Sequence, residues 1–150
     1  MNYYPIFLDL RSKPVLVVGG GTVATRKVKG LLESNALITV VAPAISSELR
    51  VLSQVTLTER EYESTDCRGC ALVFAATDKR DVNAQIARDA ASLGIPANIA
   101  DAPEECGFIV PARISEGGIQ IAVSTGGTDP RRAVAIRDRI RKSLAAILSV

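Results

Sequence analysis

Short apolar runs alternate with amphipathic stretches along most of the chain. Runs rich in β-branched residues predict strands buried on both faces, and the stretches between them have the apolar spacing of surface helices. We expect strands at 15–18, 37–41, 55–59, 72–76 and 95–100. We expect helices at 22–34, from Ser46 or Ser47 to Leu52, and at 79–92. This order predicts an α/β fold with a doubly wound, mostly parallel, Rossmann-like sheet.

Local signals add detail to this layout. Asp78 is a candidate N-cap for the helix at 79–92, and Gly94 follows that helix as a stop signal. The apolar lead-in Tyr4–Leu10 is expected to pack on the sheet edge.

The pattern changes after Pro103. Residues 108–110 and 119–123 predict strands joined across a turn at 116–118. Asp129 as N-cap and Pro130 as first residue predict that a helix begins there. We therefore expect a small C-terminal α+β unit. Because its hairpin is too small to be stable alone, it should pack against the main sheet or against a second chain.

The first predicted strand leads into a glycine turn. Gly19, Gly21 and Ala24 fall on G-x-G-x-x-A, directly before a predicted helix that begins at Thr22. Gly19 would allow the tight turn, Gly21 the approach of a pyrophosphate, and Ala24 close packing of helix on strand. We interpret the turn as a dinucleotide site, although such turns also serve as simple connections. The acidic residue expected about 20 residues later is missing, so this rule does not choose between NAD and NADP.

Composition restricts the class of protein. Of its 150 residues, 47% are hydrophobic and 23% are charged, which predicts a globular protein with a hydrophobic core. The net charge of +2 is too small to indicate nucleic acid as the main partner. The apolar runs are too short to span a membrane, and the N-terminus does not resemble a signal peptide, so we expect a cytoplasmic protein without a membrane partner. The absence of histidine excludes His-dependent triads.

The three cysteines give little reason to expect redox or metal chemistry. Cys67 and Cys70 form a C-x-x-C segment, but Cys70 leads into an apolar strand rather than a helix, and no second pair completes a zinc site. We predict no metal site.

Polar residues that follow the predicted strands are the candidates for chemistry. Thr77 and Asp78 could meet the nicotinamide half of a cofactor, or could simply cap a helix. Asp101 could act as a general base just past the fifth strand, or could be a turn residue before Pro103. The last predicted helix is strongly basic, which fits either a solvated face or a docking surface for a polycarboxylate ligand.

Segments in order along nearly the whole chain resemble one known family. They are Pro5–Leu8, Val17–Ala24 with Arg26-Lys27, Phe74–Asp78, Asn98–Pro103, Phe108–Pro111 and Ala122–Pro130. The chain resembles the precorrin-2 dehydrogenase / sirohydrochlorin ferrochelatase family, the N-terminal module of siroheme synthase. The resemblance implies NAD-dependent oxidation of precorrin-2, a tetrapyrrole, to sirohydrochlorin, and in some members insertion of ferrous iron.

The resemblance also implies roles for individual residues. Asp101 falls on the proposed catalytic aspartate of the family. Thr22, Val23, Pro43 and Ala44 fall on its cofactor contacts, and join Gly19, Gly21, Ala24, Thr77 and Asp78, which the glycine turn and the strand ends already indicate. Substrate contacts are expected from Asn98, Ser124, Thr125, Gly126 and Gly127.

The same resemblance divides the chain and predicts its assembly. Residues 1–112 would form the NAD-binding domain, and residues 113–150 a dimerisation segment that makes the protein a homodimer. Family members usually continue into a helical region that helps to enclose the tetrapyrrole, and Thr125 stands where some members have serine. An alternative hypothesis is an NAD(H)-sensing module without catalysis, which would have no need of Asp101.

Overall fold

The computed structural model describes residues 3–148, with side chains up to Leu144. The chain divides into two compact units, one formed by Phe7–Phe108 and the other by Ile109 onward together with the N-terminal residues up to Ile6. The outermost residues of the predicted domains, 1–2 and 149–150, lie outside the described part. The domain boundary predicted at 112–113 and the dimerisation role stay predictions.

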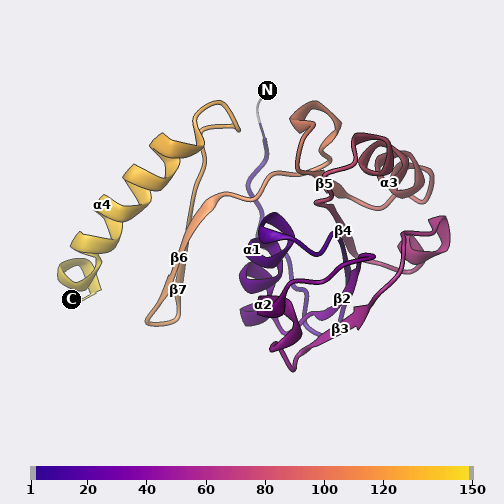
Figure 1. The fold of residues 1–150 in the computed structure, drawn as a ribbon. Helices are drawn as coiled ribbons and strands as arrows, with labels where there is room; N and C mark the ends of the chain where they lie inside the picture. The colour runs from indigo at the N-terminus through magenta and orange to yellow at the C-terminus, as the bar shows by residue number, and fades with distance from the viewer. Residues whose placement is uncertain (1–2, 149–150) are drawn as a thin grey trace. The chain divides into compact units, whose positions relative to one another are not determined.

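The first unit is built on a parallel five-stranded sheet (Figure 1). The sheet order is β3-β2-β1-β4-β5, so the chain crosses from the β3 edge back to the far side of β1 before adding β4. This reversal confirms the doubly wound fold class. The strands are β1 Pro14–Val18, β2 Leu37–Val41, β3 Val55–Thr58, β4 Leu72–Ala75 and β5 Ala97–Ile99.

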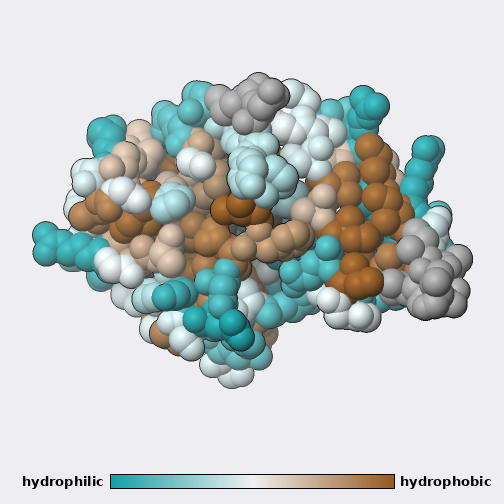
Figure 2. Space-filling view, turned by 180° about the vertical axis from the view of Figure 1, so that it is seen from behind, coloured by the Kyte–Doolittle hydropathy of each residue, from teal (hydrophilic) through white to brown (hydrophobic). Residues whose placement is uncertain are grey.

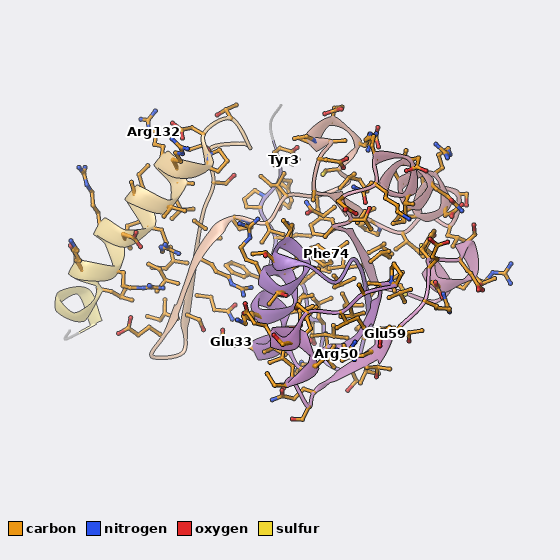
Figure 3. The ribbon with its side chains drawn as sticks, in the orientation of Figure 1. Tyr3, Glu33, Arg50, Glu59, Phe74 and Arg132 are labelled. Atoms are coloured by element: carbon orange, nitrogen blue, oxygen red, sulfur yellow. The ribbon has the colours of Figure 1, made fainter. Side chains whose placement is uncertain are left out.

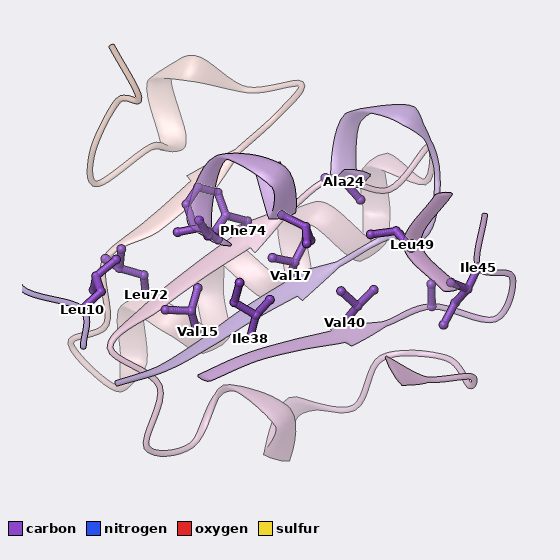
Figure 4. Packing of buried hydrophobic residues seen from close by; sticks show 14 residues of the cluster. Leu10, Val15, Val17, Ala24, Ile38, Val40, Ile45, Leu49, Leu72 and Phe74 are labelled. Carbon is purple, nitrogen blue, oxygen red and sulfur yellow. The ribbon is translucent and has the colours of Figure 1, made fainter. Parts of the chain in front are cut away.

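Helices cover both faces of this sheet. The α-helices are α1 Thr22–Leu31, α2 Ser47–Arg50 and α3 Arg80–Ser92, and short 3-10 turns span Leu32–Ser34, Ser64–Cys67 and Pro103–Glu105. Alternate strand residues point to opposite faces. Val15, Val17 and Phe74 pack with α1 and α2 on one side (Figure 4). Leu16 and Val73 pack on the other side, against α3.

The second unit consists of a hairpin and a helix. Strands β6 Ala112–Glu116 and β7 Ile119–Val123 pair antiparallel, and α4 spans Pro130–Leu148. Its buried side chains include Ile114, Ala133 and Leu144. The hairpin turn falls on two glycines, Gly117 and Gly118, whose φ angles of 59° and 77° are those of a type I′ turn.

Two segments differ from the sequence-based expectation. Residues 108–110 do not form a strand, because Phe108 is anchored to the first unit: its ring meets Phe74 edge-on with centroids 5.3 Å apart. The hairpin strand begins instead at Ala112. The lead-in is also not packed as expected, since Tyr4, Phe7 and Leu8 are exposed and only its last residue, Leu10, is buried in the core.

The predicted helix caps have mixed outcomes. Asp129 caps α4 as expected, because its Oδ1 accepts a hydrogen bond from the backbone N–H of Arg132 at 2.9 Å. Asp78 is not the cap of α3, which begins one residue later than expected with Lys79 in the cap position. Ser46 occupies the cap position of α2, but its hydroxyl contacts Thr25 instead of the helix backbone.

No helix within residues 3–148 is long and apolar enough to cross a membrane.

Candidate active site

The glycine turn after β1 is fixed by close backbone contacts. Gly19 has φ +127°, and a Cβ there would lie 2.3 Å from the carbonyl oxygen of Ala76. A Cβ on Gly20 would lie 1.9 Å from the carbonyl oxygen of Ala44. Larger residues would therefore push the turn away from the loops that follow β4 and β2. The importance of Gly20 was not predicted, because the G-x-G-x-x-A pattern leaves its position open.

The beginning of α1 is open to a ligand. Gly21 is the N-cap residue, and a Cβ placed on it would meet nothing within 4 Å. No side chain caps this end, and the first turn carries no acidic residue. The first N–H groups of the helix, from Thr22 onward, therefore have no acceptor within the helix and form the positive end of its dipole. This arrangement fits the pyrophosphate of a dinucleotide.

A pocket of about 960 Å³ lies at this end of the sheet, within the first unit. It is formed by the loops that follow β1, β2 and β4, where the strand order reverses, which is where ligands bind in doubly wound sheets. Its volume is at the upper end of the range typical of cofactor sites. Among the residues predicted to contact the cofactor, those lining it are Gly19, Gly21, Thr22, Val23, Pro43, Ala44, Thr77 and Asp78.

Ala24 differs from the other predicted cofactor residues. It does not line the pocket but is fully buried between α1 and the sheet, as close packing of helix on strand requires. The next residue, Thr25, connects the start of α1 to the loop after β2. Its hydroxyl donates to the carbonyl of Gly21 at 3.0 Å and lies 3.2 Å from the hydroxyl of Ser46.

The loop after β2, which would face the adenosine half, carries no free acid. Arg50 is nearby, since its Nε donates to the carbonyl oxygen of Ile45, a pocket residue, at 3.3 Å. Its Nη2 lies 2.5 Å from Oε1 of Glu59, and both side chains are visible in Figure 3. The arginine that could receive a 2′-phosphate is therefore already paired with a carboxylate, which favours NAD over NADP.

The loop after β4 is held by Asn83, a fully buried residue of α3. Oδ1 of Asn83 accepts from the backbone N–H of Thr77 at 3.2 Å and from its hydroxyl at 2.7 Å. Nδ2 of Asn83 donates to the carbonyl oxygen of Thr77 at 3.1 Å. Thr77, a pocket residue, is thus fixed through both its backbone and its side chain.

Asp101 lies close to this loop. Its Oδ1 accepts a hydrogen bond from Nδ2 of Asn83 at 2.9 Å and lies 3.5 Å from Nη1 of Arg80. Arg80 is itself paired with Glu105. In the part of the chain that the structure describes, Oδ2 of Asp101 has no hydrogen-bond partner. The carboxylate is therefore anchored through Oδ1, while Oδ2 is left without a protein partner among the described residues. The side chain of Asp101 is 37% exposed, so a ligand can reach it.

The sheet register explains why these residues meet. Ala75 of β4 is paired with Ile99 of β5 in parallel. Thr77 and Asp101 each come two residues after this pair, so both emerge at the same edge of the sheet. The structure thus brings together the cofactor loop and the predicted catalytic carboxylate, which are 24 positions apart in the sequence.

The side chain of Asn98, a predicted substrate contact, is buried in the first unit. It is 7% exposed, and its Oδ1 accepts from Nζ of Lys27 at 2.8 Å. Its Nδ2 donates to the carbonyl oxygen of Phe108 at 3.0 Å. Burial lowers the pKa of Lys27, whose ammonium also lies over the ring of Phe74, 5.6 Å from its centroid. The amide of Asn98 is therefore engaged by its own chain.

The other predicted substrate residues belong to the second unit. They form the turn between β7 and α4, where Gly126 and Gly127 have φ angles of 65° and 83°. The backbone N–H of Gly126 donates to the hydroxyl of Ser124 at 3.0 Å. The hydroxyl of Thr125 accepts from the backbone N–H of Asp129 at 3.1 Å. These contacts give the segment a local structural role, and its role toward a substrate stays a prediction.

The cysteines of the C-x-x-C segment have the character of core residues. Burial raises the pKa of both Cys67 and Cys70, which leaves little reactive thiolate at neutral pH. The hydroxyl of Tyr62 lies 3.1 Å from Sγ of Cys67 and donates to Asp89 at 2.9 Å. Among residues 3–148, no group of three or more acidic, cysteine or histidine side chains could hold a metal ion.

Asn83 is the main residue of the site that the sequence analysis missed. One signal could have indicated it. Asn83 lies on the same face of its helix as the buried residues Ile86 and Ala90, and so is a polar residue within an apolar stripe. Buried asparagine needs several hydrogen-bond partners, which in this fold are provided by the loops after β4 and β5.

Comparisons with known proteins agree with this geometry. The family model described as "Putative NAD(P)-binding" matches residues 6–112. Siroheme synthase of Methylococcus capsulatus is 46% identical over 143 residues, which cover 93% of this chain and 30% of that protein. Siroheme synthase of Thioalkalivibrio sulfidiphilus is 42% identical over 149 residues, which cover 97% of this chain and 30% of that protein. The chain thus spans just under a third of the length of these curated relatives.

A solved structure is also similar. It is titled "SirC, precorrin-2 dehydrogenase", and it matches with a TM-score of 0.74 and 32% identity over 96% of this chain and 70% of that chain. These matches confirm the resemblance inferred from the sequence motifs. The pocket fits a dinucleotide, with an open helix start, a glycine that leaves room for phosphate and sufficient volume. The chain therefore belongs to the NAD(P)-binding family of siroheme synthase and precorrin-2 dehydrogenase, with NAD as its cofactor.

Proposed function

We propose that this chain catalyses the NAD-dependent oxidation of precorrin-2 to sirohydrochlorin. The observation that carries the proposal is the anchored carboxylate of Asp101, which Asn83 holds next to Thr77 of the cofactor pocket. A nucleotide-binding fold needs no such carboxylate for binding alone. The names of the similar proteins, siroheme synthase and precorrin-2 dehydrogenase, support the choice of substrate.

The reaction removes one hydride and one proton from the macrocycle. When bound, NAD supplies the nicotinamide ring that takes up the hydride. Oδ2 of Asp101, which has no partner within the described residues, accepts the proton as a general base. The bond to Asn83 keeps the carboxylate in one orientation while it does so.

The residues around the pocket bind and orient the cofactor. The N–H groups at the start of α1 would bind the pyrophosphate, and Gly21 leaves space for its approach. Pro43 and Ala44 would contact the adenosine half, and Thr77 and Asp78 the nicotinamide half. The nicotinamide half would then be held by the loop that Asn83 joins to Asp101.

An anaerobic assay with precorrin-2 and NAD tests the proposal, with the product followed by its absorption spectrum. Asp101→Asn preserves size but cannot accept a proton at neutral pH. We expect its turnover to fall by about 10²-fold, as loss of a general base typically costs, while its NAD affinity stays unchanged.

Other outcomes of this assay would contradict parts of the proposal. Near-normal turnover of the Asn variant would remove Asp101 from the mechanism, because asparagine would serve as well as aspartate in a turn. An unmodified chain that binds NAD but never oxidises precorrin-2 would instead favour the NAD(H)-sensing alternative.

We also propose that the protein is a homodimer formed through its second unit. Among the side chains described in that unit, which end at Leu144, few are buried, while Ile119, Val134 and Ile136 are exposed. Hydrophobic surface gathers on the part of the molecule that this unit forms, at the right of Figure 2. A hairpin with one helix is too small to be stable without further burial, which a second copy would provide.

Sedimentation at micromolar concentration tests the assembly. We expect the mass of an isologous dimer, and the mass of a monomer would refute the proposal. Insertion of ferrous iron and the cytoplasmic location stay predictions from the sequence.

A further inference from the structure

The hydrogen-bonding capacity of Asn83 is completely used. An asparagine amide has two N–H donors and one oxygen with two lone pairs. Both lone pairs of Oδ1 face Thr77, one toward its backbone N–H and one toward its hydroxyl, which lies nearer to Oδ1, at 2.7 Å, than to its other acceptor, the carbonyl oxygen of Lys79, at 3.0 Å. Of the two Nδ2 donors, one reaches the carbonyl oxygen of Thr77 and the other Oδ1 of Asp101. Because Oδ1 must accept from a backbone N–H, the orientation of the amide is fixed.

The side chain of Asn83 links two loops of the site. Asn83 is fully buried, and four hydrogen bonds join its side chain to only two residues, one after β4 and one after β5. One of these lines the cofactor pocket and the other is the proposed base. A single side chain thus sets the position of the base relative to the cofactor loop.

We propose that Asn83 is the positioning residue of this active site, which holds the Asp101 carboxylate in register with the cofactor loop at Thr77. This inference rests on the proposed role of Asp101 as general base. Asn83 itself has no capacity left to bind substrate or move a proton. Its contribution is to occupy Oδ1 of Asp101, so that only Oδ2 is presented to the substrate.

Arg80 does not duplicate this role. Its Nη1 lies 3.5 Å from the same Oδ1, a distance at the limit of a hydrogen bond, and its other nitrogen is paired with Glu105. Arg80 is also about half exposed, whereas Asn83 is enclosed. Loss of Asn83 therefore leaves Asp101 free to rotate, while loss of Arg80 leaves the Asn83 bond in place.

A kinetic double-mutant cycle tests the proposal. The variants are Asn83→Ala, Asp101→Asn and the two combined, assayed with precorrin-2 and NAD. We expect Asn83→Ala to lower kcat by about 10-fold or more, as misplacement of a catalytic group by a fraction of an ångström does. In the Asp101→Asn background the same change should lower kcat by less than about twofold, because the group that it positions no longer acts.

A structural control separates positioning from loss of stability. Ile86→Val removes one methyl group from the same helix at a fully buried site. It should lower the unfolding midpoint by about 2–4 °C without lowering kcat. If Ile86→Val slows the reaction as much as Asn83→Ala does, the effect of Asn83 is one of stability, and the proposal is wrong.

A second variant covers the case in which Asn83→Ala does not fold. Asn83→Asp has the same shape and still accepts from Thr77, but it places a carboxylate oxygen where Nδ2 donated to Asp101 and to the carbonyl oxygen of Thr77. Its unfolding midpoint should be lower than that of the unmodified chain. In the double variant with Asp101→Asn the midpoint should recover in part, since the asparagine at position 101 can now donate to the carboxylate at position 83, while the repulsion from the Thr77 carbonyl oxygen remains. This readout needs neither substrate nor cofactor.

Each remaining outcome is decisive. If Asp101→Asn is slow but Asn83→Ala is as fast as the unmodified chain, or lowers kcat equally in both backgrounds, the positioning role is refuted while the proposed function stands. If Asp101→Asn has normal turnover, the proposed function of Asp101 fails and this inference fails with it. If the midpoint of the double variant does not rise above that of Asn83→Asp alone, the hydrogen bond between positions 83 and 101 does not act as inferred, and the proposal is wrong.

Discussion

Substitutions at two neighbouring glycines of the turn after β1 should have different effects, one on the stability of the fold and the other on NAD binding. A Cβ on Gly20 would lie 1.9 Å from the carbonyl oxygen of Ala44, about 1.5 Å closer than the 3.4 Å at which ordinary contact begins. A Cβ on Gly21 would meet nothing within 4 Å. The first position should therefore control folding, and the second should control the space that a ligand occupies.

The magnitudes follow from these distances. Gly20→Ala must displace the backbone of the loop after β2, and such overpacking costs about 1–3 kcal/mol or more. The unfolding midpoint should fall by about 3–10 °C for a chain of this length. Gly21→Val is compatible with the extended backbone at that position, φ −92° and ψ −166°, and should cost about 1 kcal/mol at the helix start. Its side chain would occupy the pyrophosphate site and lower NAD affinity by about tenfold or more.

Calorimetric NAD titration and thermal unfolding of both variants measure the two effects. Gly21→Val should bind NAD weakly and melt only about 2–4 °C early, and Gly20→Ala should bind NAD if folded but melt earlier than Gly21→Val. Normal NAD affinity of Gly21→Val would show that this turn is not the phosphate site. A Gly20→Ala variant as stable as the unmodified chain would refute a role of this position in folding.

Two further predictions concern ion pairs. Glu59→Gln should free Arg50 for a 2′-phosphate and raise NADP affinity relative to NAD by about fivefold, or about 1 kcal/mol, and an unchanged ratio in calorimetry would contradict this. Arg60 donates to Asp66 at 2.6 and 2.9 Å, and these bonds lower the pKa of that carboxyl. Because the folded pKa is the lower one, the pair stabilises the fold at neutral pH, and this contribution is lost as the pH falls through the folded pKa. Arg60→Leu should therefore lower the unfolding midpoint by about 2–4 °C at pH 7, and by less towards about pH 2; an equal deficit at both pH values would refute the reasoning.

The centre of the sheet could be predicted from the sequence because its strands are continuous apolar runs. Val15–Val18 and Leu72–Ala75 are buried on both faces in the structure, as the middle of a parallel sheet requires. The segment at 108–110 has the same apolar character but is not a strand. Its outcome depends on a contact between Phe108 and Phe74, which are 34 positions apart, and no local pattern encodes such a contact.

The residues of the site also divide into those whose role depends on the local sequence and those whose role depends on distant segments. Gly19 and Gly21 could be predicted because their roles depend on the backbone of one turn and on the helix that follows it. The partners of Gly20 and Asn83 could not, because each acts on a loop that becomes its neighbour only when the strands are ordered. The apolar stripe of α3 indicates that Asn83 is buried, but not which residues it binds. Ala44 follows β2, and Asp101 follows β5.

The register of the sheet is the physical origin of the site. Val18 of β1 pairs with Val41 on one side and with Ala75 on the other, and Ala75 pairs with Ile99. These four residues form one row across the sheet, and each segment that contributes to the site begins directly after its member of the row. A strand rises about 3.3 Å per residue, so a slip of β5 by two residues would displace Asp101 by about 6.6 Å from the cofactor loop. A displacement of that size exceeds any hydrogen bond that Asn83 could make. The buried hydrophobic pairing that fixes the register is therefore also the condition under which a carboxylate and a nucleotide pocket can act as one site.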